Sequence, residues 1–159
     1  MSFKLSFPFE KTLPSADFTD RIYEEIKTEF GSLTSVPILA RFKKPDGSWT
    51  RRIVMVFDTG ATISLLPKYI GVQLSVQRYV SHRLIGIAKR KECEIPVKIA
   101  RVVMRIEDAY GVTSPEIQVW VAIAERDDVP IVLGMKGIMD TFRFEADPSK
   151  EKLYLTWKK

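Results

Sequence analysis

The stretch of sequence that decides the fold is residues 54–67, which read VMVFDTGATISLLP. Within it the carboxylate of Asp58 directly follows an apolar run, and burying a charge costs several kcal/mol unless hydrogen bonds or a partner compensate. Thr59 offers a hydroxyl for a supporting hydrogen bond, Gly60 permits a tight turn with backbone N–H groups facing the carboxylate, and Ala61 leaves room beside it. The local chemistry therefore predicts a preorganised acid.

An ordinary turn is the competing interpretation of these three residues, because Asp and Gly are common at strand ends for conformational reasons alone. The flanking sequence favours the chemical interpretation. Apolar residues dominate on both sides of Asp58-Thr59-Gly60, which leaves little that resembles an exposed turn.

Most of the chain after residue 35 has a β-type pattern. Short apolar runs alternate with turn signals, and Pro45-Asp46-Gly47 between two such runs predicts a hairpin. A second hairpin is predicted around residues 147–150, near the end of the chain. The predicted strands are residues 37–42, 52–57, 78–87, 93–106, 117–124, 142–144 and 153–155. Many short strands and few helices predict a mostly β protein, either a small barrel or a sandwich.

The first 35 residues predict one strand and one helix. Phe or Leu occupies every second position from residue 3 to residue 9, which places large apolar groups on one side of a strand. Apolar residues at four-residue spacing predict a helix over residues 16–30, and Gly31 follows as a stop signal. Neither segment carries a cluster of reactive groups, so we interpret both as scaffold.

Composition limits the class of protein. A chain of 159 residues that is 45% hydrophobic is expected to fold as a single domain. No apolar run approaches the roughly 18 residues that span a bilayer, and the N-terminus does not resemble a signal peptide, so we expect a cytoplasmic protein without a membrane partner. Cys93 and His82 are the only cysteine and histidine, which does not favour a Cys–His nucleophile.

The net charge of +5 makes a nucleic-acid-binding β-protein an alternative. The basic residues gather at 41–44, 51–52 and 89–91, next to predicted turns, and lack the interleaved aromatic residues of a base-stacking surface. We therefore interpret them as solvated strand edges, and nucleic acid is not an expected partner.

Residues 57–64 resemble the signature of the retropepsin-like aspartic peptidases, which is an apolar strand, then Asp-Thr-Gly-Ala, then a nearby Ser or Thr. Residues 131–134, Ile-Val-Leu-Gly, match a second element of that family, and residues 135–142 resemble its short helix. The resemblance covers about residues 36–157 and implies a closed acid-protease-type β-barrel with one short C-terminal helix.

The chain is accordingly divided into residues 1–35, an N-terminal strand and helix extension outside the resemblance, and residues 36–159, a retropepsin-like domain. The resemblance further implies that terminal strands of two chains form an intersubunit sheet.

The implied activity is that of an aspartic endopeptidase without metal or cofactor, in which Asp58 is the catalytic carboxylate. Two carboxylates are needed, one to accept a proton from water and one to polarise the scissile carbonyl. Since Asp-Thr-Gly occurs once in the chain, the second Asp58 is expected from a second copy in a homodimer. Thr59 would lock the pair across the dimer axis, and Gly60 would supply backbone N–H groups.

A flap that closes over substrate is expected roughly two to three dozen residues after Asp58, at residues 83–88. An extended peptide or unfolded protein would bind beneath it as an added strand. The expected substrate contacts are Ala61, Leu84, Ile85, Gly86, Ile87 and Leu133. The alternative is a peptide-binding or dimerisation module that keeps this fold but cleaves little or nothing, because a fold and a motif do not establish turnover.

Overall fold

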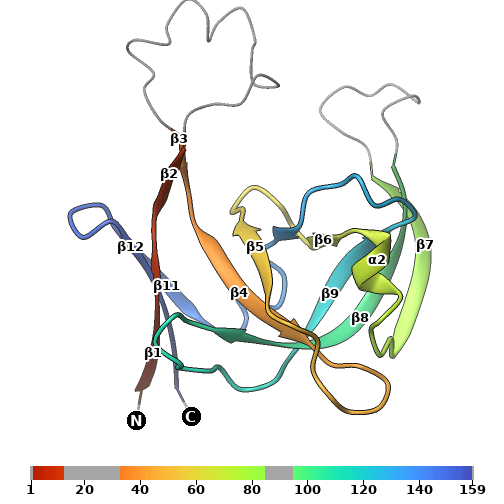
Figure 1. Cartoon of the computed structure of the whole chain (residues 1–159), viewed down its shortest axis with the longest axis horizontal. Coiled ribbons are helices and arrows are strands. Elements are labelled where there is room, and N and C mark those ends of the chain that lie inside the picture. Colours follow the sequence, from red (N-terminus) through yellow and green to blue (C-terminus); the bar gives the residue numbers. More distant parts are fainter. Residues whose placement is uncertain (1, 13–32, 85–94, 159) are drawn as a thin grey trace, which may run out of the picture.

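The computed structural model describes residues 2–12, 33–84 and 95–158, which form two main β-sheets and a two-stranded sheet (Figure 1). The elements are β1 (Ser2–Pro8), β2 (Glu10–Thr12), β3 (Leu33–Ser35), β4 (Pro37–Phe42), β5 (Ile53–Phe57), β6 (Ser64–Leu66), α2 (Lys68–Gly71), β7 (Arg78–Leu84), β8 (Ile95–Glu107), β9 (Ile117–Ala124), β10 (Val132–Leu133), β11 (Arg143–Asp147) and β12 (Lys152–Lys158). The mostly β prediction is confirmed. The helix predicted over residues 16–30 lies outside the described residues.

The larger sheet closes on itself as a ring of strands. Its order is β4-β5-β10-β6-β9-β8-β7, and β8 also pairs with β4. The 13 residues of β8 make this closure possible, because one part pairs with β7 and β9 while residues 104–107 reach β4. Alternate side chains of these strands point inward, and the core they fill includes Ile38, Ala40, Phe42, Met55, Val102, Met104 and Ile106.

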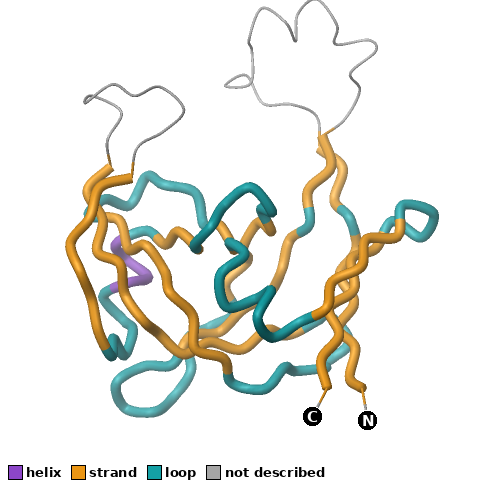
Figure 2. Tube along the Cα trace, turned by 180° about the vertical axis from the view of Figure 1, so that it is seen from behind, coloured by secondary structure: helices purple, strands orange, loops and turns teal. Residues whose placement is uncertain are grey.

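The smaller sheet joins the two ends of the chain. Its order is β1-β12-β11, and the register from Ser2↔Lys158 to Pro8↔Lys152 places the strand ends side by side (Figure 2). Leu5 and Leu155 of this sheet are fully buried in the same core as the ring. The strand predicted at residues 3–9 is thus confirmed as β1, and within one chain the two terminal strands pair with each other.

Residues 135–142 form consecutive turns instead of the expected short helix. The N–H groups of Met139 and Phe142 do donate four residues back, to the carbonyls of Met135 (2.9 Å) and Ile138 (2.8 Å). Gly137 interrupts the run because its φ of +89° lies outside the helical region. Close packing fixes this conformation, since a Cβ on Gly137 would lie 2.5 Å from Val119 Cγ1.

The ring positions the loop that follows β5. This loop joins β5 to β6 at the end of the molecule where β2 and β7 also end and β3 begins (Figure 1). Among the described residues, none of the helices has the length and hydrophobicity that crossing a bilayer requires.

Candidate active site

Asp58 is the first residue after β5, and neighbouring strands hold its backbone from both sides. Its N–H donates to the carbonyl of Leu133 in β10 at 3.0 Å. One residue earlier, the N–H of Phe57 donates to the carbonyl of Val36 at 3.0 Å. β5 lies between β10, which runs parallel to it, and β4, which runs antiparallel. Hydrogen bonds from both sides therefore hold the backbone at Asp58 in place.

The carboxylate of Asp58 is exposed and supported by its own turn. The N–H of Gly60 donates to Asp58 Oδ1 at 2.8 Å, and the N–H of Ala61 donates to the Asp58 carbonyl at 3.2 Å. A backbone N–H of the turn, that of Gly60, thus faces the Asp58 carboxylate, as the sequence predicts. The single chain leaves the carboxylate in solvent, so the desolvation cost expected from the sequence does not arise within one chain.

The loop after Asp58 is joined to a second loop that begins at Gly134. A Cβ on Gly134 would lie 2.4 Å from the carbonyl carbon of Ile63, so only glycine fits there without moving backbone. The N–H of Gly134 donates to the buried Oγ of Ser64 at 3.0 Å. The next two N–H groups, of residues 135 and 136, donate to the carbonyls of Ala61 (2.9 Å) and Thr62 (2.8 Å). These contacts set the position of the Asp58 loop.

Ser64 and Gly134 are therefore positioning residues, a role that their places in the two family-like motifs did not specify. The signal for Ser64 was a hydroxyl in an otherwise apolar stretch, between Ile63 and Leu65. Ser64 is only 1% exposed, and a buried hydroxyl needs a hydrogen-bond partner. Its partner comes from a segment 70 residues away, which local pattern does not identify.

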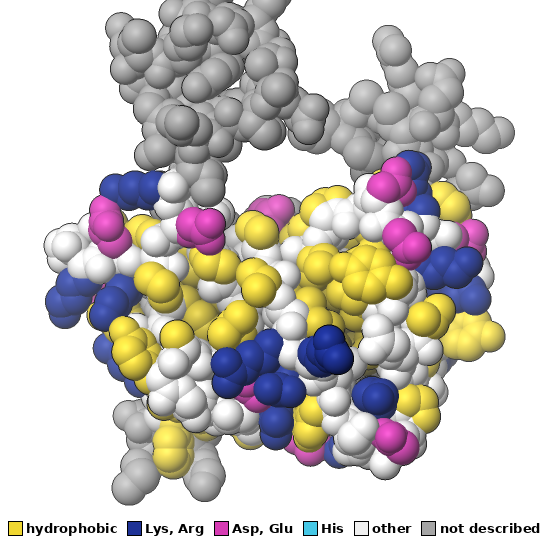
Figure 3. Space-filling model, viewed as in Figure 1, with side chains coloured by type: hydrophobic (Ala, Val, Ile, Leu, Met, Phe, Trp, Pro, Cys, Tyr) yellow, Lys and Arg dark blue, Asp and Glu magenta, His cyan; other side chains and the backbone are white. Residues whose placement is uncertain are grey.

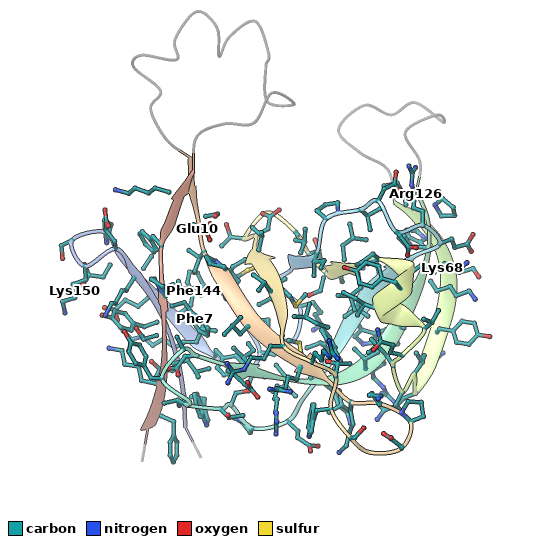
Figure 4. The ribbon with its side chains drawn as sticks, viewed as in Figure 1. Phe7, Glu10, Lys68, Arg126, Phe144 and Lys150 are labelled. Carbon is teal, nitrogen blue, oxygen red and sulfur yellow. The ribbon has the colours of Figure 1, made fainter. Side chains whose placement is uncertain are left out.

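Two cavities flank the Asp58 loop. One of about 270 Å³ is lined by Asp58 together with apolar side chains that include Phe9, Phe57 and Phe144. Phe144, on β11, is labelled in Figure 4. The other, of about 310 Å³, runs from Thr59 to Met139 and Asp140. The site thus offers an exposed acid between apolar surfaces.

Asp140 does not supply a second acid in this chain, although it lies near the loop. Its carboxylate pairs with the Lys136 ammonium at 3.1 Å and accepts the N–H of Gly137 at 3.3 Å. The hydrogen bond from Lys136, followed by that from Gly137, lowers the pKa of Asp140 below its ordinary value. Asp140 is therefore ionised and engaged elsewhere at neutral pH.

The remaining predicted site residues have different locations. Thr59 and Gly60 are exposed beside Asp58, and Ala61 lines the 310 Å³ cavity. Leu133 is fully buried, so its backbone holds Asp58 while its side chain stays in the core. Leu84 is the last residue of β7. Ile85, Gly86 and Ile87 lie outside the described residues, as does most of the predicted flap. Among the described residues, no group of three His, Cys, Asp or Glu is arranged to hold a metal ion.

Comparison with solved structures shows the fold. A retropepsin-like aspartic protease from Rickettsia conorii is similar to this chain with a TM-score of 0.50 and 15% sequence identity. The likeness covers 99% of this chain and 93% of that one. No protein-family model matches the chain, and no curated protein matches it either. The ring of strands thus fits a retropepsin-like fold.

Proposed function

We propose that this chain is one half of a homodimeric aspartic endopeptidase in which two Asp58 carboxylates activate water. The observation that supports it best is the exposed carboxylate of Asp58 on a loop fixed by Gly134. A preorganised acid at the surface of one chain is suited to meet its copy across a twofold axis. The retropepsin-like fold adds support of a more general kind.

The reaction follows from two close carboxylates that share one proton, because both cannot readily be charged at once. The unprotonated Asp58 accepts a proton from water, whose oxygen bonds to the peptide carbonyl carbon. The protonated Asp58 donates its proton to the carbonyl oxygen, giving a neutral tetrahedral diol. Collapse of the diol breaks the C–N bond, and the proton taken from water passes to the departing amine. A diol hydroxyl gives its proton back to the Asp58 that had protonated the carbonyl oxygen, so that a carboxylic acid forms and the pair again holds one shared proton.

In this proposal the turn residues keep their predicted roles. The Gly60 N–H, which donates to Asp58 Oδ1 at 2.8 Å, orients the carboxylate before substrate arrives. Thr59 is exposed beside it and is free to meet its counterpart in a second chain. The flap at residues 83–88 and its contacts with substrate remain part of the proposal.

Asp58→Asn tests the proposal because asparagine keeps the size of the side chain and its acceptor for the Gly60 N–H, yet accepts no proton from water. The variant and the wild type are compared as dimers by sedimentation and in cleavage of an unstructured protein between about pH 3 and about pH 8. The variant should fold, dimerise and cleave nothing. The wild-type rate should fall as pH rises and the pair loses its shared proton.

Near wild-type cleavage by a well-folded Asp58→Asn protein would overturn the assignment. Absence of cleavage by both proteins, with the dimer intact, would favour the alternative peptide-binding or dimerisation module.

A further inference from the structure

A cavity of about 530 Å³, larger than either cavity beside Asp58, lies at the start of β5. One wall comes from the turn between β4 and β5 and the other from α2. We call it the basic groove and define it by Lys44, Arg51, Arg52, Val54, Tyr69 and Ile131. In Figure 3, Lys and Arg side chains gather below a hydrophobic area on the face that carries this turn. The groove therefore combines cations with an apolar surface.

The cations of the groove are only partly neutralised by the chain itself. Arg52 pairs with the buried carboxylate of Glu107 at 2.9 Å. Glu107 also pairs with Arg41 (2.8 Å) and Arg105 (3.3 Å), so one carboxylate serves three guanidinium groups. Arg51 is exposed and has no ion-pair partner among the described residues. The groove keeps an excess of positive charge that complements an acidic ligand.

The backbone of β5 is open along this groove. The N–H of Val56 donates to the carbonyl of Ile131 at 3.0 Å, on the side of β5 that faces β10. The direction of the backbone N–H and C=O groups in a strand repeats every second residue. The N–H and C=O of Val54 therefore point, like those of Val56, to the side of β5 that faces β10. Within β5, only Val56 and Phe57 pair with β10, and no described strand lies beside Val54 on that side. An unpaired edge of this kind binds extended peptide.

Stacked nucleic-acid bases fit the groove less well than peptide does. Trp49 lines the groove, but its ring has the Arg105 guanidinium 4.5 Å and the Lys43 ammonium 5.6 Å from its centroid. The chain's own cations therefore occupy positions over this ring that a base would need. The apolar surface at Val54 and Ile131 instead suits aliphatic side chains of a peptide.

We propose that the basic groove is a docking site for an extended acidic segment of a protein substrate. The segment adds to the edge of β5 at Val54, places aliphatic side chains against Val54 and Ile131, and directs carboxylates toward Arg51, Arg52 and Lys44. The inference rests on the proposed function in one respect, that the docked protein is also the one cleaved. Docking itself requires no Asp58.

Binding is measured with full-length Asp58→Asn protein at low salt, using a fluorescein-labelled nine-residue peptide of alternating Glu and Val. Adding Arg51→Glu should weaken binding about tenfold, since an attraction becomes a repulsion on an exposed side chain. Lys150→Glu is the matched control, because it makes the same charge change in the turn between β11 and β12, far from the groove (Figure 4). That variant should bind within about twofold of its parent.

A peptide N-methylated at alternate amides tests the strand edge, because it keeps every charge but cannot pair with Val54; it should lose binding. The proposal would be overturned if the N-methylated peptide bound as tightly as the unmodified one. It would also be overturned if Arg51→Glu and Lys150→Glu weakened peptide binding equally. Arg51-dependent binding of an oligouridine without binding of the peptide would overturn it too. Wild-type protein that binds the acidic peptide but cleaves no protein would contradict the proposed function and leave the docking site standing.

Discussion

Gly134→Ala is the substitution that most sharply tests how the Asp58 loop is held. The new Cβ would lie 2.4 Å and 2.5 Å from the carbonyl carbon and oxygen of Ile63 and 2.8 Å from the backbone nitrogen of Ser64. All three atoms belong to backbone, so the two loops must separate by about 1 Å to restore ordinary contact. Overpacking of this kind costs about 1–3 kcal/mol. Losing the buried hydrogen bond from Gly134 N–H to Ser64 Oγ adds about 1–3 kcal/mol.

The expected loss in the free energy of unfolding is therefore about 2–6 kcal/mol, measured by urea denaturation. Cleavage should fall about a hundredfold even at temperatures where the variant is folded, because the loop carries Asp58 and misplacement by about 1 Å has that effect. Gly111→Ala is the control. Gly111 has a φ of +84° in open space and belongs to neither the Asp58 loop nor the basic groove, so alanine there costs about 1 kcal/mol of backbone strain and should leave cleavage unchanged. If the free energy of unfolding of Gly134→Ala stays within about 0.5 kcal/mol of the wild-type value and the variant cleaves normally, the close contact between Gly134 and the Asp58 loop is wrong.

Two further predictions concern charged side chains. Glu107→Gln leaves three guanidinium groups without their shared carboxylate and should lower the free energy of unfolding by about 1–3 kcal/mol, since the arginines are partly exposed. Glu116→Gln, which breaks an exposed pair with Lys43, should change it by less than about 1 kcal/mol; equal losses in urea denaturation would contradict the burial argument. Asp140→Asn should destabilise slightly near neutral pH. Because Lys136 lowers the pKa of Asp140 in the folded state, that contribution is full above the unfolded pKa and disappears as pH falls through the folded value. Urea denaturation of Asp140→Asn and wild type near pH 7 and near pH 2 should show the difference vanish in acid, and a difference that persists there would refute the assignment.

The sequence predicts the parts of the site that depend on neighbouring residues. The apolar run before Asp58 forms β5, the Asp58-Thr59-Gly60 turn forms with its N–H on the carboxylate, and Pro45-Asp46-Gly47 turns the chain between β4 and β5. Each follows from a local rule on turn residues or strand alternation. The alternation at residues 3–9 likewise predicts which face of β1 is buried.

The features that the sequence did not predict depend on distant contacts. β10 has two residues, too few for a periodic pattern, yet it pairs with both β5 and β6 and supplies the carbonyl that binds Asp58 N–H. Gly137 breaks the expected helix because of its packing against Val119 in β9. The partner of β1 is also undetermined by its own sequence, since alternation predicts a buried face and not the neighbouring strand.

The most direct test of the central claim, that each active site needs two Asp58 residues, is to mix wild type with Asp58→Asn and measure cleavage after subunits exchange. In an equal mixture about one quarter of the dimers carry two Asp58 carboxylates, so activity should be about half of that of the same amount of wild type alone. Total wild-type concentration is held constant while Asp58→Asn is added, and activity should fall in proportion to the wild-type fraction. Activity that stays constant as Asp58→Asn is added, with exchange shown by mixed-tag capture, would contradict the account, because each wild-type chain would then act alone.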